Sequence, residues 1–251
     1  MINLSQANTT LILSNNEFPK QTNKKLERIE EILKSEELDS FFSIYSLTIT
    51  EDKRIASGGK DGNISISSYD LNKKTWKRDI HKEKAHDYNV TSLCTLEGNR
   101  LLSSSDDCSI KIWKVFETKI ELIKEINEHT RGVNRVIPLS KGRFASCSLI
   151  DTVVIWKNDT TYECLSTLKH NCSVSSILQL KGKEILVSCG YYSTPGLSFW
   201  NITKNNYTLQ HNTEGYGVYR STHMIELPDG NIALSSYDEP NPIIIFDISS
   251  Y

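Results

Sequence analysis

Residues 86–115, HDYNVTSLCTLEGNRLLSSSDDCSIKIWKV, contain three short apolar runs separated by turn-forming residues. The runs cover residues 90–96, 100–105 and 109–115, and the Glu-Gly-Asn between the first two is typical of a hairpin turn. A fourth, weaker run follows at 120–126. Four consecutive strand-like runs joined by short turns predict one antiparallel sheet.

The same pattern recurs along the chain. A serine follows a short apolar run five times, in RIAS, RLLS, RFAS, ILVS and IALS, at Ser57, Ser103, Ser146, Ser188 and Ser235. The spacings between these serines are 46, 43, 42 and 47 residues. In four units a later run ends in an aromatic residue: Trp113, Trp156, Trp200 and Phe246. A period of about 40–50 residues with four strand-like runs per period predicts an all-β repeat protein built from propeller blades.

The units resemble the blades of the WD-repeat (WD40) β-propeller family. The family pattern joins a His before the first strand, a Ser or Thr on the second, an Asp in the next turn and a Trp on the third. The 86–126 unit carries all four, as His86, Ser103, Asp107 and Trp113. The resemblance implies a buried chain of hydrogen bonds in which the imidazole links the carboxylate to the serine hydroxyl, which accepts from the indole N–H. Such a chain would supply the donors that a buried carboxylate requires.

The other units match this tetrad in part, so the chain resembles a divergent member of the family, and the resemblance spans about residues 41–251. Two units carry three of its residues: His129, Ser146 and Trp156, and His170, Ser188 and Trp200. Ile150 stands at the Asp position of the former, with Asp151 one place later, and the longer turn GYYSTPG (190–196) of the latter has no Asp. The outer units retain less: Ser57 and Asp61, with Ser67 in place of Trp, in the first, and Ser235, Asp238 and Phe246 in the last.

The predicted organisation is an N-terminal segment, 1–40, followed by a β-propeller of about five four-stranded blades. The blades are expected at about 41–85, 86–128, 129–169, 170–211 and 212–251. Within the N-terminal segment, residues 22–38 predict an amphipathic helix whose apolar stripe is formed by Leu26, Ile29, Ile32 and Leu33. This helix would pack on the propeller or bind a second chain.

The number of units leaves three interpretations open. The fifth unit stops after its third strand, at 243–251. The chain is a piece of a longer propeller, an open propeller completed by a partner or by its own copy, or a ring in which TTLIL (9–13) supplies the outer strand. An incomplete ring would expose an edge strand that can pair with another chain.

Composition narrows the function classes. Lys plus Arg is 29 and Asp plus Glu is 31, so a net charge of −2 gives no global case for nucleic-acid binding. We expect no signal peptide and no membrane insertion, because no segment approaches 18 consecutive apolar residues. The six cysteines lack zinc-ligand spacing, so no metal or other cofactor is predicted. These features favour a cytoplasmic or nuclear protein with reduced cysteines, of which Cys94, Cys147 and Cys189 fall within strands.

Catalysis is not predicted. The Ser, His and Asp residues recur once per unit, as expected for a structural tie within a repeat rather than for a hydrolase triad. The sequence also lacks the GxSxG, GxGxxG and P-loop motifs.

The leading prediction is a non-enzymatic scaffold or adaptor that binds a protein or peptide partner through the loops at one end of the blades. The resemblance points to seven positions at this end: Lys60, Asn89, Thr91, Asp106, Asn134, Ser175 and Tyr237. Tyr191 and Tyr192 lie in the long turn at 189–196 and are expected on the same face. Exposed tyrosines provide large contact area at low entropic cost. The alternative is an open propeller subunit of a coat-like or pore-like assembly. It would be completed by a blade from another chain, through edge pairing along residues 243–246, or by further C-terminal sequence.

Overall fold

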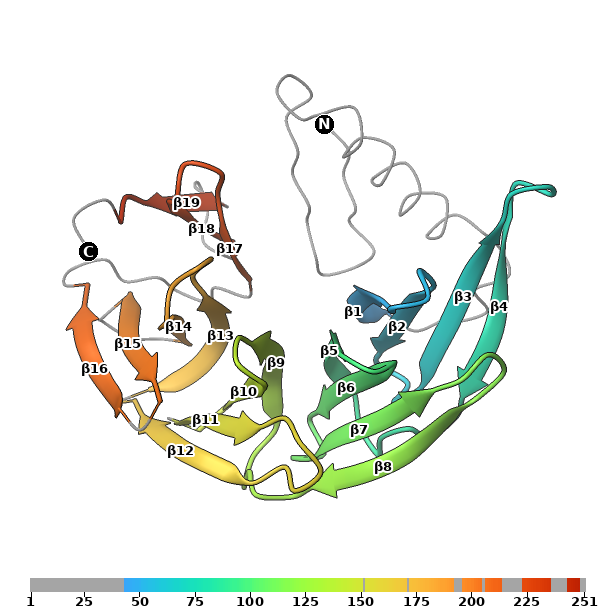
Figure 1. Cartoon of the computed structure of the whole chain (residues 1–251), viewed down its shortest axis with the longest axis horizontal. Coiled ribbons are helices and arrows are strands. Elements are labelled where there is room, and N and C mark those ends of the chain that lie inside the picture. The colour runs from blue at the N-terminus through green and yellow to red at the C-terminus, as the bar shows by residue number, and fades with distance from the viewer. Residues whose placement is uncertain are drawn as a thin grey trace. The chain divides into compact units, whose positions relative to one another are not determined.

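The computed structural model describes residues 43–150, 152–170, 172–191, 196–204, 206–213, 223–235 and 243–248 (Figure 1). Every regular element in these ranges is a β-strand, which confirms the predicted all-β class. The helix predicted at 22–38 and the strand considered at 9–13 lie outside the described residues, as do Asp151, Tyr192, Tyr237 and Asp238.

The strands form five antiparallel sheets in which neighbouring strands follow one another along the chain. The first sheet comprises β1 (Ile44–Ile49), β2 (Ile55–Gly59), β3 (Ile64–Asp70) and β4 (Thr75–Lys82). The second comprises β5 (Val90–Leu96), β6 (Arg100–Ser105), β7 (Ile110–Val115) and β8 (Ile120–Ile126). The third comprises β9 (Val133–Leu139), β10 (Arg143–Ser148), β11 (Thr152–Lys157) and β12 (Cys164–Lys169).

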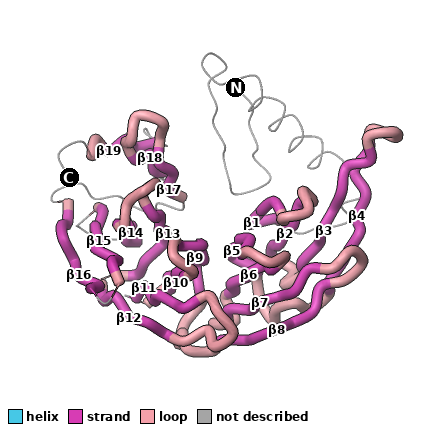
Figure 2. The backbone as a smooth tube through the Cα atoms, viewed as in Figure 1, coloured by secondary structure: helices cyan, strands magenta, loops and turns pink. Residues whose placement is uncertain are grey.

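The fourth sheet comprises β13 (Ser173–Gln179), β14 (Ile185–Tyr191), β15 (Leu197–Thr203) and β16 (Asn206–Asn212). The fifth contains three strands within the described ranges: β17 (Met224–Glu226), β18 (Ile232–Ser235) and β19 (Ile243–Phe246). The repeated serines lie on the second strand of each sheet. Figure 2 shows the alternation of strands and connecting loops.

The inner strands are buried on both faces, which explains why their sequences are apolar at consecutive positions. All six residues of β10 are buried. On the outer strand β8, by contrast, only the two terminal residues, Ile120 and Ile126, are buried.

The chain divides into two compact units, each with its own core. Unit 1 contains the residues up to Asp107 together with Lys111–Ile126, and unit 2 contains Cys108–Ile110 and the residues from Asn127 onward. The core of unit 1 joins the first two sheets through side chains that include Ile64, Ile66, Val90, Leu93 and Leu101. In unit 2, one cluster joins the third and fourth sheets and another joins the fourth and fifth.

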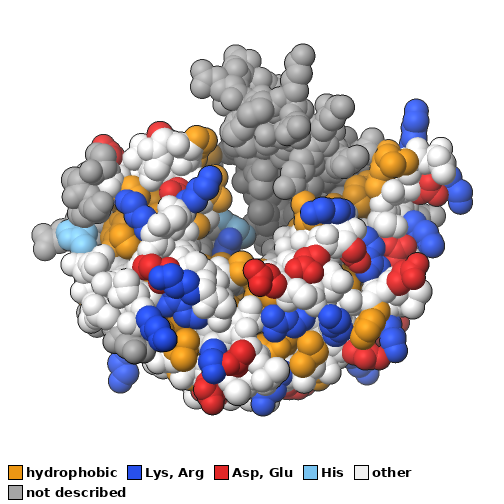
Figure 3. All heavy atoms as spheres, viewed as in Figure 1, with side chains coloured by type: hydrophobic (Ala, Val, Ile, Leu, Met, Phe, Trp, Pro, Cys, Tyr) orange, Lys and Arg blue, Asp and Glu red, His pale blue; other side chains and the backbone are white. Residues whose placement is uncertain are grey.

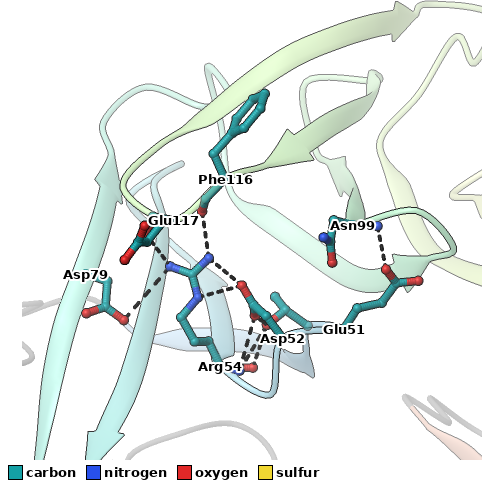
Figure 4. A network of polar contacts seen from close by, with 8 residues as sticks. Glu51, Asp52, Arg54, Asp79, Asn99, Phe116 and Glu117 are labelled. Carbon is teal, nitrogen blue, oxygen red and sulfur yellow. Dashed lines mark hydrogen bonds and ion pairs between the residues drawn. The ribbon is translucent and has the colours of Figure 1, made fainter.

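Within unit 1, a buried arginine ties the first sheet to the second (Figure 4). Arg54, just before β2, donates from Nη2 to the Phe116 carbonyl at 2.6 Å and from Nη1 to the Glu117 carbonyl at 2.7 Å. Asp52 orients the guanidinium by accepting from Nε at 2.9 Å and from Nη2 at 2.6 Å. The planar fork of arginine allows one side chain to serve the carboxylate and two carbonyls together.

Unit 2 repeats this arrangement at Arg143, which also stands three residues before the repeated serine. Its guanidinium contacts the Glu184 carboxylate, in the turn between β13 and β14, at 2.7 Å and the Ile202 carbonyl on β15. Because these ties connect neighbouring repeats, one arginine position stabilises the stacking of blades in both units.

Candidate protein-binding loops

The second sheet contains a continuous hydrogen-bonded chain of four side chains. Trp113 Nε1 donates to Ser103 Oγ at 2.8 Å, and this oxygen lies 2.7 Å from His86 Nε2. His86 Nδ1 lies 2.9 Å from Asp107 Oδ2. The network assigns the proton to Nδ1, which donates to the carboxylate, while Nε2 accepts from the serine hydroxyl.

These four hydrogen-bonded side chains lie in the interior and join two strands, β6 and β7, to two loops. The His86 side chain is fully buried and that of Asp107 is 10% exposed. Ser103 and Trp113 are buried on β6 and β7. Each polar atom in the chain gains a partner inside the sheet, which offsets the cost of its removal from water.

The hydrogen-bonded tetrad of His86, Ser103, Asp107 and Trp113 fixes the loop that precedes β5. The Asp107 carboxylate also accepts from the Asp87 backbone N–H at 3.1 Å. The His86 backbone N–H donates to the Gly62 carbonyl at 3.0 Å. Gly62 has a φ of +74°, and a Cβ there would lie 2.4 Å from the His86 carbonyl oxygen. Glycine therefore allows the turn of the first sheet to approach the loop of the second.

The third sheet contains a shorter version of the chain. His129 Nε2 lies 2.7 Å from Ser146 Oγ, which accepts from Trp156 Nε1 at 2.8 Å. Ile150 occupies the position that corresponds to Asp107. Burial lowers the pKa of His129 from 6.5 to about 4, so the neutral imidazole is favoured in the folded chain.

The fourth sheet has the same three-membered chain. His170 Nε2 lies 3.0 Å from Ser188 Oγ, which accepts from Trp200 Nε1 at 2.8 Å. In the first sheet the tetrad Trp is replaced by Ser67 and no His stands at the corresponding position before β1. There Asp61 accepts from the Asn63 backbone at 3.1 Å and from its side-chain amide at 2.8 Å.

In unit 1, the candidate contact residues differ in their availability to a partner. Lys60 is exposed in the turn after β2. Asn89, Thr91 and Asp106 are half-buried and are engaged internally. The amide of Asn89 donates to the Asp106 carboxylate at 2.7 Å, and Thr91 Oγ1 lies 2.9 Å from Ser104 Oγ.

In unit 2, two of the candidate residues form internal hydrogen bonds of the same kind. Asn134 donates to the Val174 carbonyl at 2.7 Å, and Ser175 donates to the Cys189 carbonyl at 3.2 Å. Tyr191 ends β14, and only its backbone is described.

Tyr88 is not among the nine candidate positions, although it is the most exposed aromatic side chain of the described loops. This side chain is 66% exposed between Asp87 and Asn89, whose hydrogen bonds hold the loop. Its position two residues after the tetrad His was the available signal. On the face drawn in Figure 3, acidic, basic and apolar side chains are intermixed, and neither sign of charge dominates the described part of this face.

Neither a metal centre nor a membrane span is found in the described ranges. No group of three or more His, Cys, Asp or Glu residues there is arranged to hold a metal ion. The same part of the chain has no helix long and apolar enough to cross a bilayer.

Comparison with known proteins agrees with the geometry of the second sheet. Residues 77–114, which include the complete tetrad, match the family described as "WD domain, G-beta repeat". The five repeated antiparallel sheets, three of which contain the buried His–Ser–Trp hydrogen bonds, and this match together support a fold similar to that of the WD-repeat β-propellers.

The similar proteins share only parts of their length with this chain. The nuclear distribution proteins nudF of Aspergillus flavus and Aspergillus oryzae are each 33% identical over 107 residues, which is 41% of this chain and 23% of either relative. A probable cytosolic Fe-S cluster assembly factor of Schizosaccharomyces japonicus is 33% identical over 75 residues, or 30% of this chain and 12% of that protein. The chain thus matches less than a quarter of the length of these relatives.

A solved structure supports the fold. A chain in the crystal structure of the mitotic checkpoint complex aligns with a TM-score of 0.57 at 17% identity, covering 80% of this chain and 74% of that one.

Proposed function

We propose that this protein is a non-enzymatic scaffold that binds a protein or peptide partner through the loop before β5 and the neighbouring turns of unit 1. WD-repeat propellers are in general scaffolds for protein interaction, which supports the class of function. The region proposed here comprises Lys60, Asp87 and Tyr88 and the turn that contains Asp106.

The observation that carries the proposal is an exposed aromatic side chain on a fixed backbone. Tyr88 is 66% exposed, yet its neighbours are held by hydrogen bonds to Asp107 and Asp106. A fixed loop loses little conformational entropy on binding, and a tyrosine contributes a large apolar area with a polar tip. In protein interfaces, a few central residues, often aromatic, contribute most of the binding energy.

The test compares Tyr88→Ala with Leu71→Ala. Leu71 is a suitable control because its side chain is 73% exposed, in the turn between β3 and β4 away from the proposed loops. Each purified chain is mixed with a cell extract, and bound proteins are quantified by mass spectrometry. We expect Tyr88→Ala to lose at least one saturable partner that Leu71→Ala retains. Equal partner profiles for both variants and the parent chain would contradict the proposal.

A second candidate function is suggested by the fifth sheet. Within the described ranges this sheet has three strands, and its outer strand β19 presents Ile243 and Ile245 with 43% and 61% exposure. A subunit of a larger assembly could be completed here by a strand from another chain. The mass of the purified chain in solution tests this alternative, because a stable monomer that is unchanged by Ile245→Lys argues against it.

We also propose a cytoplasmic or nuclear location. The support is compositional: none of the cysteines in the described ranges forms a disulfide, and Cys94, Cys147 and Cys189 are buried in strands. Imaging of the tagged chain in cells tests this location.

A further inference from the structure

Unit 2 contains a groove along β9 and β13 that extends to the turns that follow these two strands. Its volume is about 480 Å³. The floor and walls are largely apolar, formed by Ile137, Pro138, Ile177, Leu178 and Leu180. Since residues 135–140 come from the third sheet and residues 177–184 from the fourth, the groove runs across the junction of two blades.

Hydrogen bonds between the two turns preform the groove. The Ser140 backbone N–H donates to Gln179 Oε1 at 2.8 Å, and Gln179 Nε2 donates to the Lys183 carbonyl at 2.9 Å. Ser140 Oγ donates to Glu184 Oε1 at 2.7 Å. The groove therefore exists before any ligand binds, and little ordering is required on binding.

The charge around the groove is unbalanced. Its acidic lining residue, Glu184, is already paired with Arg143 at 2.7 Å and with Lys141 at 3.5 Å. Although burial alone would raise its pKa, hydrogen bonds from Ser140 and Arg143 hold the pKa of this carboxyl below its usual range. Glu184 therefore remains ionised and is neutralised from within the protein.

Two exposed lysines of the lining have no such partner. Lys181 and Lys183 flank Gly182 in the turn and form no ion pair with any described residue. Glu226 lies next to this turn, where it accepts from the Lys181 backbone N–H at 2.6 Å. Arg135 lines the groove as a third cation. Cations thus outnumber carboxylates along the rim of an apolar groove.

We infer that this groove binds an acidic peptide segment that also carries apolar side chains. The lysines and Arg135 would meet the carboxylates, while the apolar side chains would cover Ile137 and Leu178. A nucleic-acid ligand is less well matched, because few cations line the groove and no aromatic ring for a base to stack on is found among its described lining residues. This site is separate from the loops of unit 1, so either proposal can fail without the other.

A defined peptide set tests the inference. Fluorescein-labelled octapeptides with zero, two or four aspartates and zero or two leucines are titrated with the purified chain, and binding is followed by fluorescence anisotropy. Binding should require both aspartate and leucine and should weaken as salt is added. For Lys181→Gln combined with Lys183→Gln, we expect the Kd to rise roughly threefold to thirtyfold, from the usual strength of exposed charge pairs.

The matched control is Lys73→Gln combined with Lys74→Gln, which removes two exposed lysines from a turn of unit 1. This control should bind the peptides as the parent chain does, and thermal unfolding verifies that both double variants are folded. The inference is overturned if no peptide binds, if leucine is not required, or if both double variants weaken binding equally. Tighter binding of a labelled oligothymidine than of the acidic peptides would also overturn it and would favour a nucleic-acid site.

Discussion

Asp107 is the residue on which the hydrogen-bonded chain of the second sheet depends. Its carboxylate receives His86 Nδ1–H and the Asp87 backbone N–H. Asp107→Ala should therefore leave a buried imidazole donor without its acceptor and lower the free energy of unfolding by about 1–3 kcal/mol. Urea denaturation of the parent chain and the variant measures this difference.

Asp70→Ala serves as the control for Asp107→Ala, because Asp70 accepts only from backbone groups in an exposed turn. Asp70→Ala should lower the free energy of unfolding clearly less than Asp107→Ala does. If both substitutions have the same effect, the buried chain does not stabilise the second sheet as described.

His129 makes the third sheet sensitive to acid. Its folded-state pKa of about 4 lies below the ordinary value of 6.5, because burial disfavours the charged imidazole. The unfolded chain therefore takes up a proton first as the pH falls. The contribution of His129 to the free energy of unfolding is therefore fully present above about pH 6.5. It is lost progressively as the pH falls towards 4, by up to about 3 kcal/mol.

The His129→Gln variant isolates this contribution. Urea denaturation at several pH values gives the stability gap between the parent chain and the variant. The gap should narrow as the pH falls from about 6.5 to 4, because only the parent chain carries this histidine. A gap that stays constant over this interval would show that His129 is not the group responsible.

The cysteines should differ sharply in reactivity. Burial raises the pKa of the Cys147 thiol to about 12, so almost no thiolate forms near neutral pH, whereas Cys164 is exposed on β12. N-ethylmaleimide should label Cys164 in the folded chain while Cys147 reacts only after unfolding. Peptide mapping of the labelled protein checks the order, and early labelling of Cys147 would contradict the buried position of β10.

At the scale of elements, the close approach of two loops depends on Gly62. A Cβ there would lie 2.4 Å from the His86 carbonyl oxygen, whereas one at Gly142 would meet no atom within 4 Å. Both glycines have positive φ, so the backbone strain of alanine is common to the two sites. We expect Gly62→Ala to destabilise the chain by roughly 1 kcal/mol or more beyond Gly142→Ala. Thermal unfolding of the two variants measures the difference, and equal effects would contradict the described contact.

The strands were largely predictable because their signal is local. In the second sheet, the runs at 90–96, 100–105 and 120–126 correspond to β5, β6 and β8 without change, and the remaining run begins one residue before β7. Consecutive apolar residues and turn glycines lie within a few positions of one another, so periodicity is enough to reveal them.

The contacts between sheets were not predictable in the same way. Arg54 and Arg143 were visible in RIAS and RFAS, but their acceptors are carbonyls 59–63 residues further along the chain. Every residue carries a backbone carbonyl, so the sequence does not indicate which carbonyl accepts the hydrogen bond. Figure 4 shows these contacts for Arg54. In the same way, the sequence does not reveal that most of the polar loop positions suggested by the family resemblance form hydrogen bonds within the fold. Nor does it show that Tyr88 is exposed.

At the scale of the whole molecule, the five sheets share one antiparallel strand order. Within each compact unit, neighbouring sheets are linked by apolar clusters and by the hydrogen bonds of Arg54 or Arg143. Repeat proteins of this kind draw their stability from each repeat and from the junctions between repeats. A local change should therefore first loosen its own repeat. The loop proposed to bind a partner depends on one such local element, the tetrad of the second sheet.

Hydrogen exchange along the entire chain, followed by mass spectrometry, tests this account most directly. In the parent chain, we expect protected segments to recur every 40–50 residues at the inner strands, as the repeat requires. In Asp107→Ala, exchange should accelerate in residues 86–90 and 105–107 while β13 and β14 remain unchanged. Unchanged exchange around Tyr88, or an equal acceleration in every sheet, would contradict the claim that the buried tetrad fixes the binding loop.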